Sequence, residues 1–171
     1  MANELKGNAP LVQVEHLKKY FQVGRGKVLH AVDDVTFSIP KGTTLGLVGE
    51  SGCGKTTVGR TLVGLYQPDG GRVTFDGQDI THLKGKEKRA ITRRMQMVYQ
   101  DPYASLNPFF TVGEIITEGL EIHNIGESKK ERMEIAYGLL NRVGLHREHA
   151  NRFPHEFSGG QRQRVGLARS L

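Results

Sequence analysis

The stretch GESGCGKTT, residues 49–57, restricts the possible folds of this chain more than any other part of its sequence. It fits the pattern G-x-x-x-x-G-K-[ST], in which a glycine-rich turn precedes a lysine and a hydroxyl residue. The segment before it, TLGLVG (44–49), is short and apolar on both faces, as in a buried parallel strand. A helical pattern begins at Lys55. This order predicts an α/β fold that contains a phosphate-binding loop.

Each residue type in this loop has a chemical reason to be there. Glycines let backbone N–H groups approach phosphate oxygens without clashes from Cβ atoms, and the helix N-terminus adds a partial positive charge. Lys55 supplies a cation for the β and γ phosphates, and the Thr56 hydroxyl is a ligand for Mg²⁺. The predicted nucleotide contacts are Gly49, Glu50, Ser51, Gly52, Cys53, Gly54, Lys55, Thr56 and Thr57. The loop alone leaves GTPases, small-molecule kinases and ATPases open, although the Asn-Lys-x-Asp and Asp-x-x-Gly segments of guanine-binding proteins do not occur.

Alternating apolar and polar residues predict strands on both sides of the loop. LVQVEHL (11–17) and VTFSI (35–39) alternate, and Gly24 and Gly26 between them predict a hairpin. RVTF (72–75) predicts a further strand ending at the turn Asp76-Gly77. These segments indicate an antiparallel β region beside the nucleotide-binding core.

The second half of the chain is helical in character. A basic run at residues 84–94 predicts a helix with a solvated face, followed by a strand at 96–100 and a break at Asp101-Pro102. Ser128 and Glu131 predict a reciprocal capping box, and Gly144 ends the helix that follows. The inner face of that helix is expected to carry Met133, Ala136, Leu140 and Val143.

Composition limits the setting in which the chain works. A formal charge of +6 and a pI near 9.5 suit an anionic partner: a nucleotide, a nucleic acid or a membrane surface. Cys53 is the one cysteine, so we expect a reducing compartment, and we interpret its side chain as a small filler of the loop whose thiol could report nucleotide occupancy. The N-terminus does not match a secretory signal, and no apolar run approaches the roughly 20 residues of a membrane span. No histidine group has metal-ligand spacing, so no structural metal is expected.

The segment FSGGQRQR (157–164) predicts a second anion-binding helix start, with Ser158 as N-cap and Gln161 three residues on. Together with the phosphate loop and VYQDPYASLNP (98–108), it occurs in the order seen in ABC transporter ATPase subunits, which the chain resembles from about Leu11 to Leu171. Phe157 replaces the leucine often found in that family. The segment QDPYASLNP is similar to the oligopeptide and dipeptide importer branch, which includes nickel importers.

This resemblance implies an ATP-driven head-to-tail dimer. Each ATP, with Mg²⁺, would lie between the phosphate loop of one subunit and the signature residues of the other, here Ser158, Gly159, Gly160 and Gln161. Lys55 and Gln100 would be catalytic, and Gln100 and Thr56 would reach Mg²⁺. Tyr20 would stack on adenine, with Phe21 as the neighbouring candidate.

The resemblance also implies a phosphate-loop NTPase (RecA-like) core with an antiparallel β subdomain and an inserted helical subdomain. We expect the core and β subdomain at 1–101, the helical subdomain at 102–157 and the signature helix at 158–171. The partners would be a second ATP-binding subunit, identical or paralogous, transmembrane permease subunits and, indirectly, an extracytoplasmic solute-binding protein, but no nucleic acid. The chain would act peripherally on the cytoplasmic face of the membrane. Contacts with the permease are expected at Tyr103, Leu106 and Phe109 or Phe110.

The family pattern continues after ARSL into a strand ending in Asp-Glu, which holds Mg²⁺ and activates water. We therefore interpret the chain as incomplete at its C-terminus, inactive alone and poorly stable, because the phosphate-loop strand would lack a neighbour. MQMVYQD (95–101) and AVDDV (31–35) are poor substitutes for that carboxylate pair. Two alternatives to a peptide importer ATPase stay open: a non-catalytic nucleotide-binding fragment, and a soluble ABC-type ATPase acting on nucleic acid.

Overall fold

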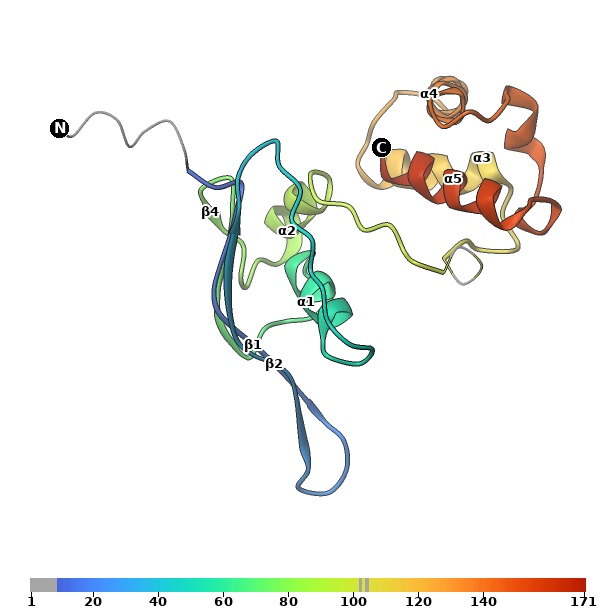
Figure 1. Cartoon of the computed structure of the whole chain (residues 1–171). Coiled ribbons are helices and arrows are strands. Elements are labelled where there is room, and N and C mark those ends of the chain that lie inside the picture. Colours follow the sequence, from blue (N-terminus) through green and yellow to red (C-terminus); the bar gives the residue numbers. More distant parts are fainter. Residues whose placement is uncertain (1–8, 102, 104) are drawn as a thin grey trace. The chain divides into compact units, whose positions relative to one another are not determined.

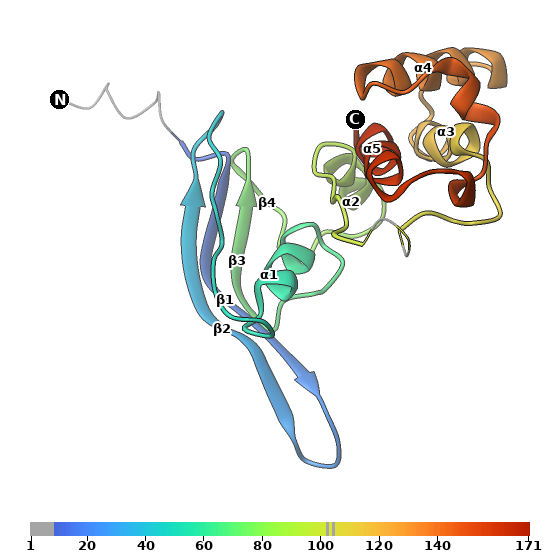
Figure 2. The same ribbon diagram turned by 45° about the vertical axis from the view of Figure 1, so that its right-hand side comes forward.

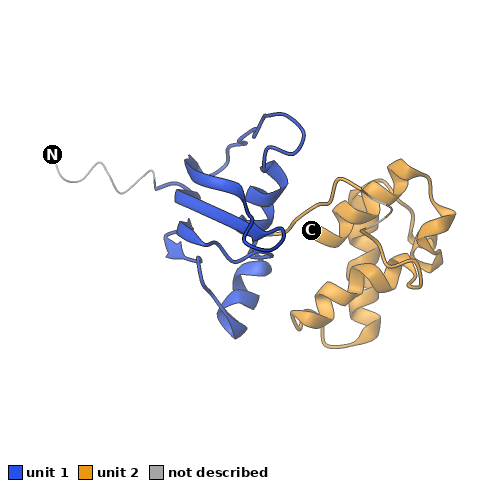
Figure 3. Cartoon of the chain, turned by 90° about the horizontal axis from the view of Figure 1, so that it is seen from below, with its two compact units in different colours: residues 1–95 blue, residues 96–171 orange. Residues whose placement is uncertain are grey.

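The computed structural model describes residues 9–101, 103 and 105–171. These form two compact units, residues 1–95 and 96–171 (Figure 3). Residues 1–8 lie outside the described part of the chain. Pro102, where we expect the helical subdomain to begin, also lies outside it. The division at 1–101, 102–157 and 158–171 stays a prediction. Among the described residues, no helix combines the length and apolar character required to cross a membrane.

The first unit contains a four-stranded antiparallel sheet in the order β2-β1-β3-β4 (Figure 2). The strands are β1 (Val12–Gln22), β2 (Val28–Ile39), β3 (Gly70–Phe75) and β4 (Gln78–Asp79). Val12 of the central strand lies opposite Ile39 on one side and Phe75 on the other. The expected antiparallel β region is therefore present, with longer first strands than the alternation predicts.

A β-bulge decides which side chains of β1 enter the core. Val12 and Val14 are buried, and strict alternation would bury His16 next. The register shifts after Val14, His16 takes a φ of 51°, and Leu17 becomes fully buried in its place. The extra residue thus keeps an ionisable side chain out of the core.

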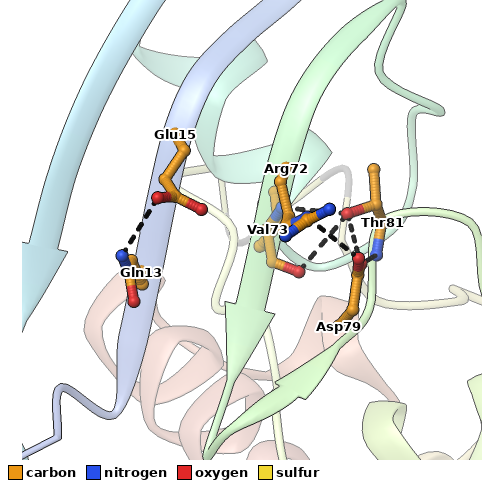
Figure 4. Close-up of polar contacts among 6 residues, drawn as sticks. All are labelled: Gln13, Glu15, Arg72, Val73, Asp79 and Thr81. Atoms are coloured by element: carbon orange, nitrogen blue, oxygen red, sulfur yellow. Dashed lines mark hydrogen bonds and ion pairs between the residues drawn. The ribbon is translucent and has the colours of Figure 1, made fainter.

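Polar side-chain contacts bind the chain to β3 beyond the short β3–β4 hairpin (Figure 4). Asp76 and Gly77 have φ values of 50° and 79°, which suit the tight turn between β3 and β4. The Val73 N–H donates to the Thr81 hydroxyl at 2.9 Å, so Thr81 satisfies a ladder donor that β4 does not reach. Asp79 accepts from the Thr81 N–H at 2.9 Å and pairs with Arg72 at 3.3 Å.

Two helices, α1 (Lys55–Leu62) and α2 (Gly85–Thr92), belong to the first unit (Figure 1). Val58 of α1 and Ile91 of α2 join one buried cluster with side chains of the sheet. The cluster contains Val12, Val14, Leu17, Val32, Val58, Val73, Phe75 and Ile91. The Lys88 ammonium also donates to the Gly64 carbonyl at 2.7 Å, which joins α2 to the chain just after α1.

Two expected strands are absent, and these two predictions are wrong. Residues 44–49 and 96–100 have no strand structure, and Leu45, Leu47 and Val98 are exposed, with Val48 93% exposed. A parallel strand forms only where neighbouring strands satisfy its backbone groups. All the strand pairs among the described residues are antiparallel and involve other segments, so these apolar stretches have no ladder to join.

The second unit is helical, with α3 (Val112–Ile122), α4 (Lys129–Arg142) and α5 (Gly159–Ser170). Two short 3₁₀ turns, η1 (Arg147–Asn151) and η2 (Pro154–Glu156), connect α4 to α5. The helices share one core, formed by Leu106, Val112, Ile115, Ile116, Ala136, Leu140, Leu145, Ala150, Phe157, Val165 and Ala168. Met133 and Val143 pack against it, as predicted, and Gly144 ends α4 with a φ of 73°.

Side chains cap the first turns of these helices. Ser128 accepts from the Glu131 N–H at 3.1 Å, but the Glu131 carboxylate accepts from the Glu127 N–H at 2.8 Å. The predicted Ser128–Glu131 capping is thus correct in one direction only, because Glu131 reaches a residue further back. A complete capping box at Thr111 and Glu114 was missed, although the pattern T-x-x-E that predicts it is present.

Candidate nucleotide-binding site

The phosphate loop turns back on itself around Lys55. The Lys55 ammonium donates to the Gly49 carbonyl at 2.8 Å and to the Glu50 carbonyl at 2.6 Å, and lies 3.5 Å from the Cys53 sulfur. The Cys53 N–H donates to the Glu50 carbonyl at 3.3 Å. The lysine is therefore held at the centre of the loop, next to the exposed Cys53 side chain.

Glycine is required in this loop for steric reasons. Gly52 and Gly54 have φ values of 83° and 97°, which other residues rarely adopt. A Cβ atom at Gly54 would collide with the Ala31 carbonyl oxygen of β2, and one at Gly49 would lie 2.6 Å from the Cys53 sulfur. The loop is thus a backbone cradle without side chains at its tight positions, which fits a phosphate group.

The start of α1 favours an anion. Its N-cap, Gly54, has no side chain to accept from the first-turn N–H groups, and no acidic residue lies in that turn. These donors and the helix dipole therefore stay available to an external acceptor. The Thr56 side chain is exposed, and Thr57 is half-buried. Thr56 is the hydroxyl residue of this turn that is open to a ligand.

Tyr20, the expected adenine contact, already has close neighbours on β2. Its ring stacks on His30 with a centroid separation of 4.1 Å, and its hydroxyl donates to Asp33 at 2.6 Å. That hydrogen bond to a carboxylate raises the pKa of Tyr20 to about 12. The neighbouring Phe21 ring meets Tyr66 edge-on at 5.2 Å. The adenine role of Tyr20 stays a prediction.

The signature residues begin α5 in the second unit. Ser158 accepts from the Gln161 N–H at 3.4 Å, and the Gln161 side chain accepts from the Ser158 N–H at 3.0 Å, which completes the predicted capping box. Ser158 and Gly160 are exposed, and Gly159 is half-buried. The helix thus presents its glycines at an accessible N-terminus.

Two arginines of α5 hold the chain that precedes α3, and sequence reasoning missed both. Arg162 donates to the Pro154 carbonyl at 2.7 Å and lies 3.9 Å from the centre of the Tyr103 ring. Arg169 donates to the Ser105 carbonyl at 2.6 Å. These contacts connect the segment after Gln100 to the signature helix within one unit. The repeated arginines of the signature stretch were the only available signal.

Gln100 has an exposed side chain and belongs to the second unit, whereas the phosphate loop belongs to the first. Next to it, Asp101 accepts from the Tyr103 N–H at 2.8 Å. Of the expected permease contacts, Leu106 is buried in the helical core, while Tyr103, Phe109 and Phe110 are exposed. The exposed aromatic residues are therefore the ones available to a partner.

The two carboxylates of AVDDV (31–35) have partners outside the phosphate loop. On β2, Asp33 accepts from the Tyr20 hydroxyl, and Asp34 pairs with His16 of β1 at 2.6 Å. The hydrogen bond from Tyr20 lowers the pKa of Asp33 below its usual range. In the described part of the chain, no three His, Cys, Asp or Glu residues are grouped as metal ligands.

The chain combines a phosphate loop at the start of a helix, an antiparallel β region and a separate helical unit with a second glycine-rich helix start. Together these features define a nucleotide-binding domain of the ATP-binding cassette class. The ABC transporter family model matches residues 32–171, and the chain belongs to this family.

Relatives and solved structures agree with this assignment. The chain is 56% identical to the oligopeptide transport ATP-binding protein OppF of Bacillus subtilis over 162 residues, which is 94% of this chain and 53% of that protein. It is 51% identical to AppF of the same organism, over 94% of this chain and 51% of that protein. The dimeric ATP-binding cassette MJ0796 bound to ADP and phosphate superposes with a TM-score of 0.82 at 30% identity, over 94% of this chain and 68% of that one. The likeness to these cassettes confirms the predicted fold class. The chain spans about half the length of the curated relatives it matches.

Proposed function

We propose that this chain is the ATP-binding part of an energy-coupling subunit that drives import of di- or oligopeptides. One observation carries the proposal: the Lys55 ammonium lies at the centre of a glycine cradle at the start of α1. The peptide substrate class is supported by relatives at 51–56% identity whose names describe oligopeptide transport. Hydrolysis of ATP is proposed for the longer protein that would contain this chain.

In this proposal ATP binds with its phosphates at the N–H groups of residues 49–57. Mg²⁺ would be held by the Thr56 hydroxyl and the Gln100 side-chain oxygen, both of which are hard oxygen donors that suit this ion. It would neutralise phosphate charge when bound. Lys55 would exchange its two loop carbonyls for phosphate oxygens, which are stronger acceptors because they are charged. Tyr20 is proposed as the adenine contact.

The signature helix is proposed to act on a second molecule. Ser158, Gly159, Gly160 and Gln161 would bind the γ-phosphate held by the loop of a partner subunit. The exposed helix start and the dimeric state of the MJ0796 cassette support this arrangement. The exposed rings of Tyr103, Phe109 and Phe110 would contact a transmembrane permease, and the chain would thereby work at the cytoplasmic face of the membrane.

Substitution of Lys55 tests the nucleotide-binding step. Lys55→Ala removes a charge-assisted contact worth about 1.5–3 kcal/mol, so ATP affinity should fall about 10- to 100-fold. Lys27→Ala, at the exposed hairpin tip, removes the same charge and should leave the affinity unchanged. Titration of ATP into each variant measures the difference. Equal affinities for the two variants would refute the role of Lys55.

The fragment alternative requires a different measurement. The intact mass of the native gene product distinguishes a protein of 19.0 kDa from a longer ATPase. A larger mass supports the hydrolase proposal, whereas a mass of 19.0 kDa restricts it to nucleotide binding. Co-purification with a multi-spanning membrane protein would support a transporter over an ATPase that acts on nucleic acid.

A further inference from the structure

The positive charge of this chain is concentrated in one short segment. Residues 84–94 contain six basic residues and one acid, a net charge of +5 out of the formal +6 of the whole chain. The remaining residues, with 18 basic and 17 acidic side chains, are nearly neutral. The segment forms α2 and its flanks. An electrostatic partner of this chain would therefore meet its field at α2.

Two cations of the segment serve the fold. The Lys88 ammonium donates to the Gly64 carbonyl, and Arg94 pairs with Asp76 and lies 4.8 Å from the centre of the Phe75 ring. The pairing with Arg94 lowers the pKa of Asp76. Asp79, the other acid nearby, pairs with Arg72. The acids of the β3–β4 hairpin are thus paired with Arg94 and Arg72, and they do not neutralise the other cations of the segment.

The other cations of α2 point to solvent. Lys86, Arg89 and Arg93 lie at helical positions i, i+3 and i+7, and Arg93 keeps helical φ and ψ angles of −65° and −29° at the C-cap. All three are exposed, and none forms an ion pair among the described residues. We call these three residues the basic stripe. Ile91, on the opposite side of the helix, is buried in the core of the first unit.

We propose that the basic stripe binds the anionic phospholipid headgroups of a membrane surface. A row of cations on one face of an amphipathic helix suits a planar sheet of phosphates, and each such residue contributes to the binding. The residues of α2 include no aromatic side chain, so the helix offers no platform for stacking nucleic-acid bases. The proposal rests on the proposed function, which brings the chain to a membrane, and adds a direct lipid contact to it.

The stripe is separate from the phosphate loop. Lys88 joins α2 to Gly64, beyond the C-terminal end of α1, whereas the loop lies at the N-terminal end. An eight-residue helix is about 12 Å long. A membrane surface bound along the stripe therefore does not compete with a phosphate in the loop, and the two properties are separable by mutation.

Co-sedimentation of the full 171-residue chain with vesicles tests the proposal. One set contains phosphatidylcholine alone, and the other an equal mixture of phosphatidylcholine and phosphatidylglycerol. The stripe variant is Lys86→Gln, Arg89→Gln, Arg93→Gln. The matched control is Lys129→Gln, Lys130→Gln, Arg142→Gln, which removes the same charge from exposed positions on α4. Circular dichroism establishes that each variant is folded.

The wild-type chain should bind the anionic vesicles and lose binding as salt rises. Each cation is worth about fivefold, so the stripe variant should bind on the order of 100-fold more weakly. The control should stay within about fivefold of the wild type. The proposal would be overturned if the stripe variant and the control lost vesicle binding equally. It would also be overturned if the wild-type chain bound neutral and anionic vesicles equally well. The proposal would also be overturned if the wild-type chain bound DNA or RNA but not vesicles, and the stripe variant lost that nucleic-acid binding.

The same samples separate this proposal from the proposed function. Lys55→Ala should retain vesicle binding and lose ATP affinity, whereas the stripe variant should show the reverse. Failure of the vesicle experiment with normal ATP binding would overturn only the lipid contact. If Lys55→Ala kept the ATP affinity of the wild type while vesicle binding was normal, only the nucleotide site would be overturned.

Discussion

A methyl group added at Gly54 should damage the phosphate loop more than one added at Gly52. Both glycines have positive φ, 97° and 83°, so either substitution imposes backbone strain of about 1–2 kcal/mol. At Gly52 the new Cβ atom would meet nothing within 4 Å. At Gly54 it would strike the Ala31 carbonyl oxygen, which belongs to a strand of the sheet and has little freedom to move. Overpacking of this kind adds about 1–3 kcal/mol.

The expected costs are therefore about 2–5 kcal/mol for Gly54→Ala and about 1–2 kcal/mol for Gly52→Ala. Urea unfolding followed by circular dichroism measures the free energy of unfolding, and titration with ATP measures whether the loop keeps its shape. Gly46→Ala is the control, because Gly46 has no positive φ and no atom within 4 Å of the added Cβ. If Gly52→Ala cost as much as Gly54→Ala, the steric argument from the Ala31 carbonyl would be refuted.

The remaining predictions concern the helical unit. Leu140→Ala removes a fully buried side chain and should lower the free energy of unfolding by about 2–5 kcal/mol, whereas Leu167→Ala, at an exposed position of α5, should cost much less in the same urea experiment. Donation from the Thr111 N–H lowers the pKa of Glu114 below its ordinary value of 4.5, so the stability that this carboxylate contributes is present above that value and is lost as the pH falls through the lowered pKa. Glu114→Gln should remove this part of the acid destabilisation, and identical pH profiles for the two proteins would contradict the assignment.

Local patterns were sufficient for several features. A phosphate loop that leads into α1 is recognised from glycines and a lysine at set spacings, and residues 49–57 contain them. The caps at Ser158 and Ser128 were predictable for the same reason, because a cap depends on residues within one helical turn. The hairpin at Gly24 and Gly26 also follows from local backbone preferences.

Features that depend on distant partners were not predictable. TLGLVG (44–49) has the composition of a buried strand, yet Val48 is almost fully exposed because no described segment pairs with it. Strict alternation along β1 would bury His16, but the bulge opposite β2 and β3 places Leu17 in the core instead. Similarly, the sequence does not reveal that Arg162 and Arg169 hold the segment containing Tyr103 and Ser105.

Residue types at short, regular spacings were enough to predict the phosphate loop and the signature helix start, and the resemblance carried by these motifs indicated the family. Which cations remain free for a partner became known only from the folded chain. Lys86 and Lys88 are the same residue type two positions apart, but Lys88 turns inward to the Gly64 carbonyl while Lys86 stays exposed. A charge is neutralised by groups that are near it in space, and folding brings those groups together from distant parts of the chain.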